Sequence, residues 1–244
     1  MNQENLPKAK ITLDEVINQS FKYWKATLKF QLIFSVLYLS IAYILSSFLL
    51  KYFRINEELN NIIALGFKDF EMFIKKFEIL ISSNNYKVYE ISLIASMSLI
   101  YPLNIGFFRV YTLFDEKKYI STNEIFDGFK GSTFFKLLGY FLFWGTFNYF
   151  LKKYFFPASF LWVFLTVFVG PLLYFTPMRM LEAINISAKV AWANWKIVLP
   201  CAIIAFLFSY SGFILFFVGF LFTYPFWNAI IYTLFKKFFS IKFV

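Results

Sequence analysis

Histidine is absent from this chain of 244 residues, and cysteine occurs once. Without histidine there is no histidine general base, no histidine metal ligand and no Ser-His-Asp triad. Cys201 lies within an apolar run, so we expect a small buried side chain that forms no internal disulfide. The patterns GxGxxG, GxxxxGK[ST], HExxH and CxxC are absent as well. We therefore predict no catalytic residues, no metal, no cofactor and no enzymatic activity.

Charged residues are scarce in this chain, and apolar residues are abundant. Asp, Glu, Lys and Arg make up 16% of the sequence, hydrophobic residues make up 60%, and 38 residues are phenylalanine. An average soluble domain is about 45–50% apolar and about 25% charged. A soluble fold cannot bury the surplus, which must therefore face lipid. The composition predicts an all-α membrane protein.

Six apolar stretches approach the roughly 20 residues that a helix needs to cross a bilayer. They lie at about 29–50, 90–113, 134–151, 156–178, 196–213 and 214–235. Lys136 and Gly139 fall near the start of the third stretch, so whether it crosses completely stays open. The last two stretches form one long apolar run, which must fold as a hairpin of two helices.

The positions of the basic residues predict the orientation of the chain in the membrane. With the amino terminus in the cytoplasm, sixteen of the 24 Lys and Arg residues fall on the cytoplasmic side. This excess follows the positive-inside rule and places both termini in the cytoplasm, in an inner or plasma membrane. Because the charges flank spans, anionic lipid head groups on the cytoplasmic side are the expected partners, and nucleic acid is not.

Residues 51–89 join the first two predicted spans on the outer side and do not cross the membrane. Between Leu59 and Ile81, apolar side chains recur at three- and four-residue steps among many charged residues. This spacing predicts an amphipathic helix. We expect it on the outer membrane interface or as a cap on the bundle, with a turn at 82–85 that ends it.

A short motif recurs before three of the predicted spans. It contains an acid, a polar residue three positions later and a lysine. The copies are Glu15, Asn18 and Lys22; Glu124, Asp127 and Lys130, which match more loosely; and Glu182, Asn185 and Lys189. In the first copy the polar residues share one stripe of a helix, and Thr12 with Glu15 forms a capping box. The pattern predicts a helix that lies in the cytoplasmic interface.

Two spans follow each copy of the motif, and the second span of each pair contains a proline. These prolines are Pro102, Pro171 and Pro225. The predicted unit is therefore one interfacial helix, one span and one proline-bearing span, and two spans per unit keep the units parallel. A single membrane domain, 1–244, then divides into repeats at about 12–113, which carries the insertion 51–89, at about 121–178 and at about 179–237.

The recurring motif, residues 101–109 (YPLNIGFFR) and residues 124–130 (EIFDGFK) resemble a bacterial family of uncharacterised integral membrane proteins. That family is grouped with the membrane domain found beside some glycerophosphoryl diester phosphodiesterases. The resemblance covers about 12–238 and implies a six-helix inner-membrane protein with no established activity. The phosphodiesterase domain with its acidic metal site is missing here, so its activity is not implied.

Several polar positions and the prolines are candidates for a cavity or a mouth. Prolines free backbone carbonyls, so three kinked helices could surround a ligand, or they adjust packing. Arg109 pairs with a phosphate or carboxylate inside the bundle, or it snorkels to the interface. Asn104 binds a ligand or, like many amides in spans, bridges helices. The recurring acids Glu15, Glu124 and Glu182 form a ring at a cytoplasmic mouth, or they complement helix dipoles.

We predict a non-enzymatic scaffold or accessory subunit that contacts lipid or a membrane protein partner. The alternative is a small transporter or lipid-handling protein with a central cavity lined by the proline-kinked helices. A tightly filled phenylalanine core would favour the scaffold, polar residues around one cavity would favour transport, and an apolar slot open to lipid would favour lipid handling. An enzyme acting on lipid ranks last, because the sequence shows no nucleophile with a matching base.

Overall fold

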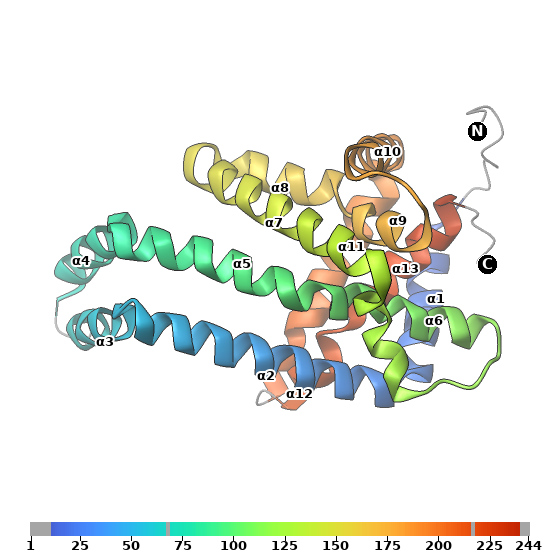
Figure 1. The fold of residues 1–244 in the computed structure, drawn as a ribbon, viewed down its shortest axis with the longest axis horizontal. Coiled ribbons are helices and arrows are strands. Elements are labelled where there is room, and N and C mark those ends of the chain that lie inside the picture. The colour runs from blue at the N-terminus through green and yellow to red at the C-terminus, as the bar shows by residue number, and fades with distance from the viewer. Residues whose placement is uncertain (1–10, 67–68, 216–217, 240–244) are drawn as a thin grey trace.

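The computed structural model of the chain describes residues 11–66, 69–215 and 218–239, and every regular element in these ranges is a helix (Figure 1). Predictions that fall on 1–10, 67–68, 216–217 and 240–244, among them the cytoplasmic placement of both termini, lie outside the described residues. In chain order the helices are α1 (Leu13–Ala26), α2 (Leu28–Tyr52), α3 (Ile55–Gly66), α4 (Phe70–Ser82), α5 (Asn84–Gly106), α6 (Phe108–Asp115), the 3-10 helix η1 (Thr122–Phe129), α7 (Gly131–Tyr154), α8 (Phe156–Leu165), α9 (Val169–Phe175), α10 (Met180–Ala193), α11 (Trp195–Ser211), the 3-10 helix η2 (Gly212–Leu215), α12 (Val218–Thr223) and α13 (Phe226–Phe239).

Five helical segments in the described ranges are long and apolar enough to cross a bilayer. They are Leu28–Tyr52, Asn84–Asp115, Phe156–Phe175, Trp195–Ile214 and Val218–Phe239. They match the first, second, fourth, fifth and sixth predicted spans and confirm an all-helical, multi-pass membrane protein. The third predicted span corresponds to α7, which has 24 residues but is not among the five. A sixth crossing therefore stays a prediction.

Each proline-bearing span consists of two helices, and this corrects the prediction of three kinked helices. Pro102 alone of the three predicted prolines lies inside a helix, α5, where it leaves the carbonyl of Ser98 without its helical donor. Pro171 lies in the first turn of α9, and Pro225 directly precedes α13. First-turn N–H groups have no partner within a helix, so proline at a helix start breaks no hydrogen bond.

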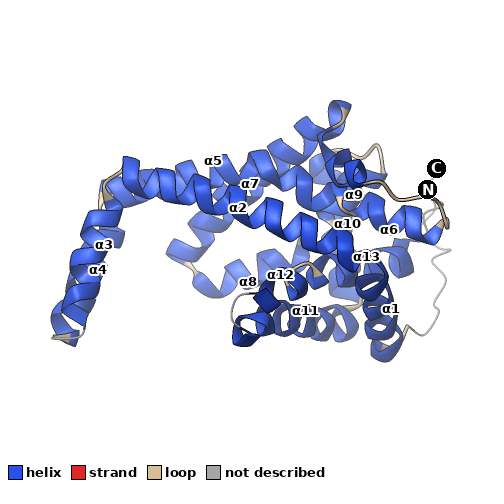
Figure 2. Ribbon diagram, turned by 90° about the horizontal axis from the view of Figure 1, so that it is seen from below, coloured by secondary structure: helices blue, strands red, loops and turns tan. Residues whose placement is uncertain are grey.

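The insertion forms two helices where the sequence predicted one. Asp69 starts α4 by accepting a hydrogen bond from the backbone N–H of Met72 at 3.0 Å. Helices α3 and α4 pack against each other at the far end of α2 and α5 and lie across their direction (Figures 1 and 2). The turn predicted at 82–85 is a break at Ser83 alone, which separates α4 from α5 and caps α5. The insertion is therefore a helical hairpin with its own small core around Ile55 and Leu80.

The second halves of the three proline-bearing spans, α6, α9 and α13, meet in the main core. Phe108, Phe175 and Tyr232 come one from each of them, and their ring centres lie 6.1 to 6.4 Å apart in pairs. Phe108 and Tyr232 are at most 1% exposed. Between helices in lipid, packing of this kind replaces the hydrophobic effect as a source of stability.

The three helices that carry the recurring motif pack against these same spans. Helix α1 packs on α13, η1 packs on α5 and α6, and α10 packs on α8 and α9. The second of these helices differs from the prediction, because η1 is a 3-10 helix. Its backbone approaches α5 so closely that a Cβ on Gly128 would overlap the carbonyl oxygen of Pro102. Each motif helix thus lies on a different proline-bearing span: η1 on the first, α10 on the second and α1 on the third.

Candidate functional site

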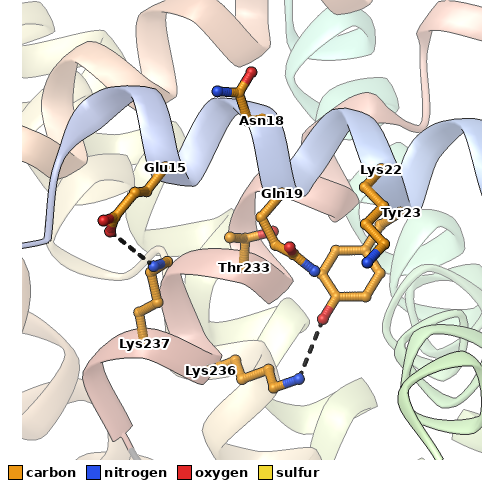
Figure 3. A pocket seen from close by; sticks show the side chains of 8 residues that line it. All are labelled: Glu15, Asn18, Gln19, Lys22, Tyr23, Thr233, Lys236 and Lys237. Atoms are coloured by element: carbon orange, nitrogen blue, oxygen red, sulfur yellow. Dashed lines mark hydrogen bonds and ion pairs between the residues drawn. The ribbon is translucent and has the colours of Figure 1, made fainter.

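The first copy of the motif borders an open groove between α1 and α13, which we call the α1–α13 groove (Figure 3). It has a volume of about 700 Å³, and every side chain that lines it carries a polar or charged group. The lining residues are Glu15, Asn18, Gln19, Lys22, Tyr23, Thr233, Lys236 and Lys237. In Figure 3 the Asn18 side chain points away from α13, whereas Gln19 and Tyr23 point toward it. The groove thus lies between the first and the last helix of the described chain.

Glu15 forms an ion pair across this groove, with its carboxylate 3.2 Å from the Nζ of Lys237. Of the two hydrogen bonds of the predicted capping box, one is formed: the Thr12 hydroxyl accepts the N–H of Glu15 at 3.3 Å. The Glu15 carboxylate binds the lysine of α13 instead of completing the box. Because its side chain is more than half exposed, this pair contributes little stability.

Asp115, at the end of α6, gathers three donors beside the groove. It accepts the hydroxyl of Tyr23 at 2.7 Å, the hydroxyl of Tyr232 at 2.8 Å and the Nζ of Lys236 at 2.7 Å. Burial, together with the hydrogen bond to Asp115, raises the pKa of the Tyr23 phenol above its ordinary value. The phenol therefore stays neutral and serves as a donor that links α1 to α6.

The sequence prediction missed the Asp115 cluster, although a signal for it was present. Tyr-Thr-Leu-Phe occurs twice, at 111–114 and at 232–235, and is followed by Asp115 in one case and Lys236 in the other. The structure joins these two unlike charges in an ion pair. Opposite charges at equivalent positions of a repeat are the feature that could have indicated the contact.

A second polar cluster surrounds η1 and contains the middle copy of the motif. Arg109 lies 3.8 Å from the carboxylate of Glu124, so its predicted carboxylate partner is Glu124. Asp127 binds the Nζ of Lys130 at 2.7 Å and also accepts a hydrogen bond from the hydroxyl of Tyr174. The bond to Asp127 raises the pKa of Lys130 above its ordinary value. These contacts hold η1 to α6 and α9.

The third copy of the motif lies on the surface of α10. Glu182, Asn185 and Lys189 are exposed, and none of them forms an ion pair with a described residue. The motif acids are therefore not equivalent: Glu15 and Glu124 bind basic side chains of α13 and α6, whereas Glu182 faces outward. The two paired acids thus have their bases on different helices, and no ion pair of the described residues is shared between the three acids.

The prolines and Asn104, which were candidates for lining a central cavity, are buried or bonded to other residues of the protein. Pro102, Pro171 and Pro225 are buried and do not line the α1–α13 groove. Asn104 accepts a hydrogen bond from the side-chain amide of Asn228 at 2.8 Å, which ties α5 to α13. Asn104 thus bridges helices, the structural alternative given by its position in the sequence.

The described part of the chain offers no group of three or more Cys, Asp or Glu side chains that could hold a metal ion. The chemistry of the two clusters is that of neutral phenols, lysines and paired carboxylates. No family model matches the chain, and neither curated proteins nor solved structures give a match. The resemblance to the phosphodiesterase-associated membrane domain therefore stays a prediction.

Proposed function

We propose that the protein is a non-enzymatic membrane scaffold whose helical body contacts anionic lipid on the side that carries its motif helices. The filled centre of the bundle is the observation that carries this proposal. Phe108, Phe175 and Tyr232 occupy the place where α6, α9 and α13 converge. A transport path between these helices would have to displace these rings, and Phe108 and Tyr232 are at most 1% exposed. The filled core supports the scaffold over the transporter.

Three repeated units in a closed arrangement form the architecture of this scaffold. In the proposed scheme α1, η1 and α10 begin the units, and each packs on the proline-bearing span of the preceding unit, with α1 on α13 of the last. Two junctions support the scheme. Thr27, after α1, and Asn194, after α10, each stand twelve positions beyond the motif acid and have φ of −110° and −116°. Both side chains donate to the carbonyl four residues earlier.

The proposed topology has six spans, with α7 as the third, in an inner or plasma membrane and with both termini in the cytoplasm. The distribution of lysines supports it by the positive-inside rule. Helices α3 and α4 then lie on the outer interface, because they run across the direction of α2 and α5 (Figure 2). Exposed apolar side chains such as Phe70 and Ile79 support contact of this hairpin with lipid. A membrane protein partner remains a further part of the proposal.

Lipid retention tests the proposal. The full-length protein is purified in mild detergent and titrated with phosphatidylglycerol or phosphatidylcholine, and bound lipid is counted by native mass spectrometry. We expect phosphatidylglycerol to bind more tightly, because each lysine near an anionic surface contributes about 1 kcal/mol. Equal binding of the two lipids would contradict the proposed anionic contact.

A vesicle assay separates the scaffold from the transporter. The protein is reconstituted into sealed vesicles loaded with small ions and organic solutes, and release is followed over time. We expect the same release as from protein-free vesicles, because the aromatic core leaves no path. Saturable, protein-dependent release of one solute would refute the scaffold proposal and favour transport.

A further inference from the structure

An apolar slot opens between α8 and the corner where α10 meets α11, and we call it the α8–α11 slot. Its volume is about 550 Å³, within the roughly 300–1,000 Å³ typical of small-molecule sites. It is lined by large apolar side chains, which are Phe160, Leu161, Phe164, Trp192, Trp195 and Leu199. Trp192 and Trp195 are 64% and 50% exposed. Phe160 on α8 is 63% exposed as well, so the slot is open to the surroundings along both its tryptophan side and its α8 side.

Two lysines stand beside the tryptophans of this slot. The Nζ of Lys196 lies 6.0 Å from the ring centre of Trp195. Lys189 precedes Trp192 by three residues, which places both on one face of α10. Neither lysine forms an ion pair with a described residue, and the nearest acid before them on α10, Glu182, is about two turns away from Lys189.

This combination matches an amphipathic anion. Tryptophan prefers the boundary between hydrocarbon and water, and lysine extends its charge toward phosphates while its stem stays in apolar contact. Basic pockets between membrane helices near the cytoplasmic side bind anionic head groups. The apolar wall supplied by α8 completes the site for an acyl chain.

We propose that the α8–α11 slot binds one phospholipid with an anionic head group. An acyl chain packs between Phe160, Leu161 and Leu199, and the phosphate lies at Lys196 and Lys189. This inference rests on the proposed lipid contact and deepens it, because it names the head-group class and the place of binding.

The test compares variants of the full-length protein by native mass spectrometry, with delipidated samples titrated with phosphatidylglycerol or phosphatidylcholine. Leu199→Trp fills the slot, and Ile203→Trp is its control, one turn further along α11, exposed and outside the slot lining. Lys196→Gln removes the charge at the slot, and Lys29→Gln removes the exposed lysine at the matching position of the first repeat.

Leu199→Trp should lower the affinity for the tightest phosphatidylglycerol at least fivefold, and Ile203→Trp should leave it unchanged. Lys196→Gln should lower the preference for phosphatidylglycerol about fivefold, the factor expected for one lysine near an anionic head group, and Lys29→Gln should not. If the wild type prefers phosphatidylglycerol but each variant behaves like its control, the slot inference fails and the proposed function stands. If the wild type shows no preference, both fail.

Discussion

Asp115 shows how single polar side chains hold this bundle together. One carboxylate binds two phenols and one ammonium, which come from α1 and α13. Tyr23 and Tyr232 are 92 and 117 residues away from Asp115 in sequence. Within lipid, hydrogen bonds between helices and close packing replace the hydrophobic force that joins helices in water. Asp115 therefore stabilises the contact between the first, middle and last helices.

Gly128 is the position where a single methyl group should have the largest effect. Its added Cβ would overlap the backbone carbonyl of Pro102, and neither the backbone that carries the Cβ nor that of α5 can easily move. Gly128→Ala should therefore lower the free energy of unfolding by about 1–3 kcal/mol. Thermal unfolding in detergent measures the effect.

Gly139→Ala is the matched control for this substitution. Gly139 lies within α7, and nothing stands within 4 Å of its Cβ position. Alanine favours a helix over glycine by about 1 kcal/mol, so this variant should be as stable as the wild type or more stable. Equal stabilities of the two alanine variants would show that η1 does not press on α5.

At the scale of elements, the breaks in the spans are held by side chains of other helices. Between α8 and α9, the Ser187 hydroxyl of α10 donates to the carbonyl of Leu165 and accepts the N–H of Phe168. Near the end of α12, the Trp24 indole donates to the carbonyl of Phe222. Backbone groups freed inside a membrane must find partners of this kind. Two of the motif helices, α1 and α10, therefore supply hydrogen-bond partners to backbone groups at the breaks of two spans.

Cysteine labelling can decide whether helix α7 crosses the membrane. We expect a full crossing, because its 24 residues exceed the length that a bilayer requires. Single cysteines replace Ser132 and Lys153, which are exposed at its two ends, while the native Cys201 is buried. A membrane-impermeant maleimide added to intact cells should label position 153 at once and position 132 after permeabilisation. Labelling of both positions from one side would rule out a crossing.

At the scale of the whole molecule, the two ends of the described chain close the bundle. The Ser20 hydroxyl of α1 donates to the Thr233 hydroxyl of α13 at 2.9 Å, and both residues are buried. The bundle thus closes without a covalent link. This contact joins the first proposed unit to the last.

A disulfide between these positions tests the closure. Oxidised Ser20→Cys/Thr233→Cys protein should form the bond, because the two oxygens already lie close together, and its stability should rise by about 2–4 kcal/mol. Non-reducing electrophoresis and thermal unfolding measure both effects, with the single variants as controls. Failure to oxidise under conditions that keep the protein folded would contradict the closure.

Composition and spacing were sufficient for the coarse architecture. The apolar runs predicted the five helical segments that are long and apolar enough to cross a bilayer, because the length and polarity of a crossing helix are local properties. The end of the amphipathic segment near 82–85 was predicted for the same reason, since turns and caps involve neighbouring residues, although the break is Ser83 alone. The prediction of one helix in the insertion was wrong, because the helical spacing of apolar residues does not reveal that α3 ends at Gly66 and α4 begins at Phe70.

The partners of the polar residues were decided by the tertiary structure. The sequence placed Asn104, Arg109 and Glu15 near spans, but their partners Asn228, Glu124 and Lys237 follow from which helices meet. The sequence by itself determined that this chain is helical and enters a membrane, because those properties follow from the solvent that each segment needs. The filled aromatic core and the Asp115 cluster required the fold, because they join side chains that are distant in sequence.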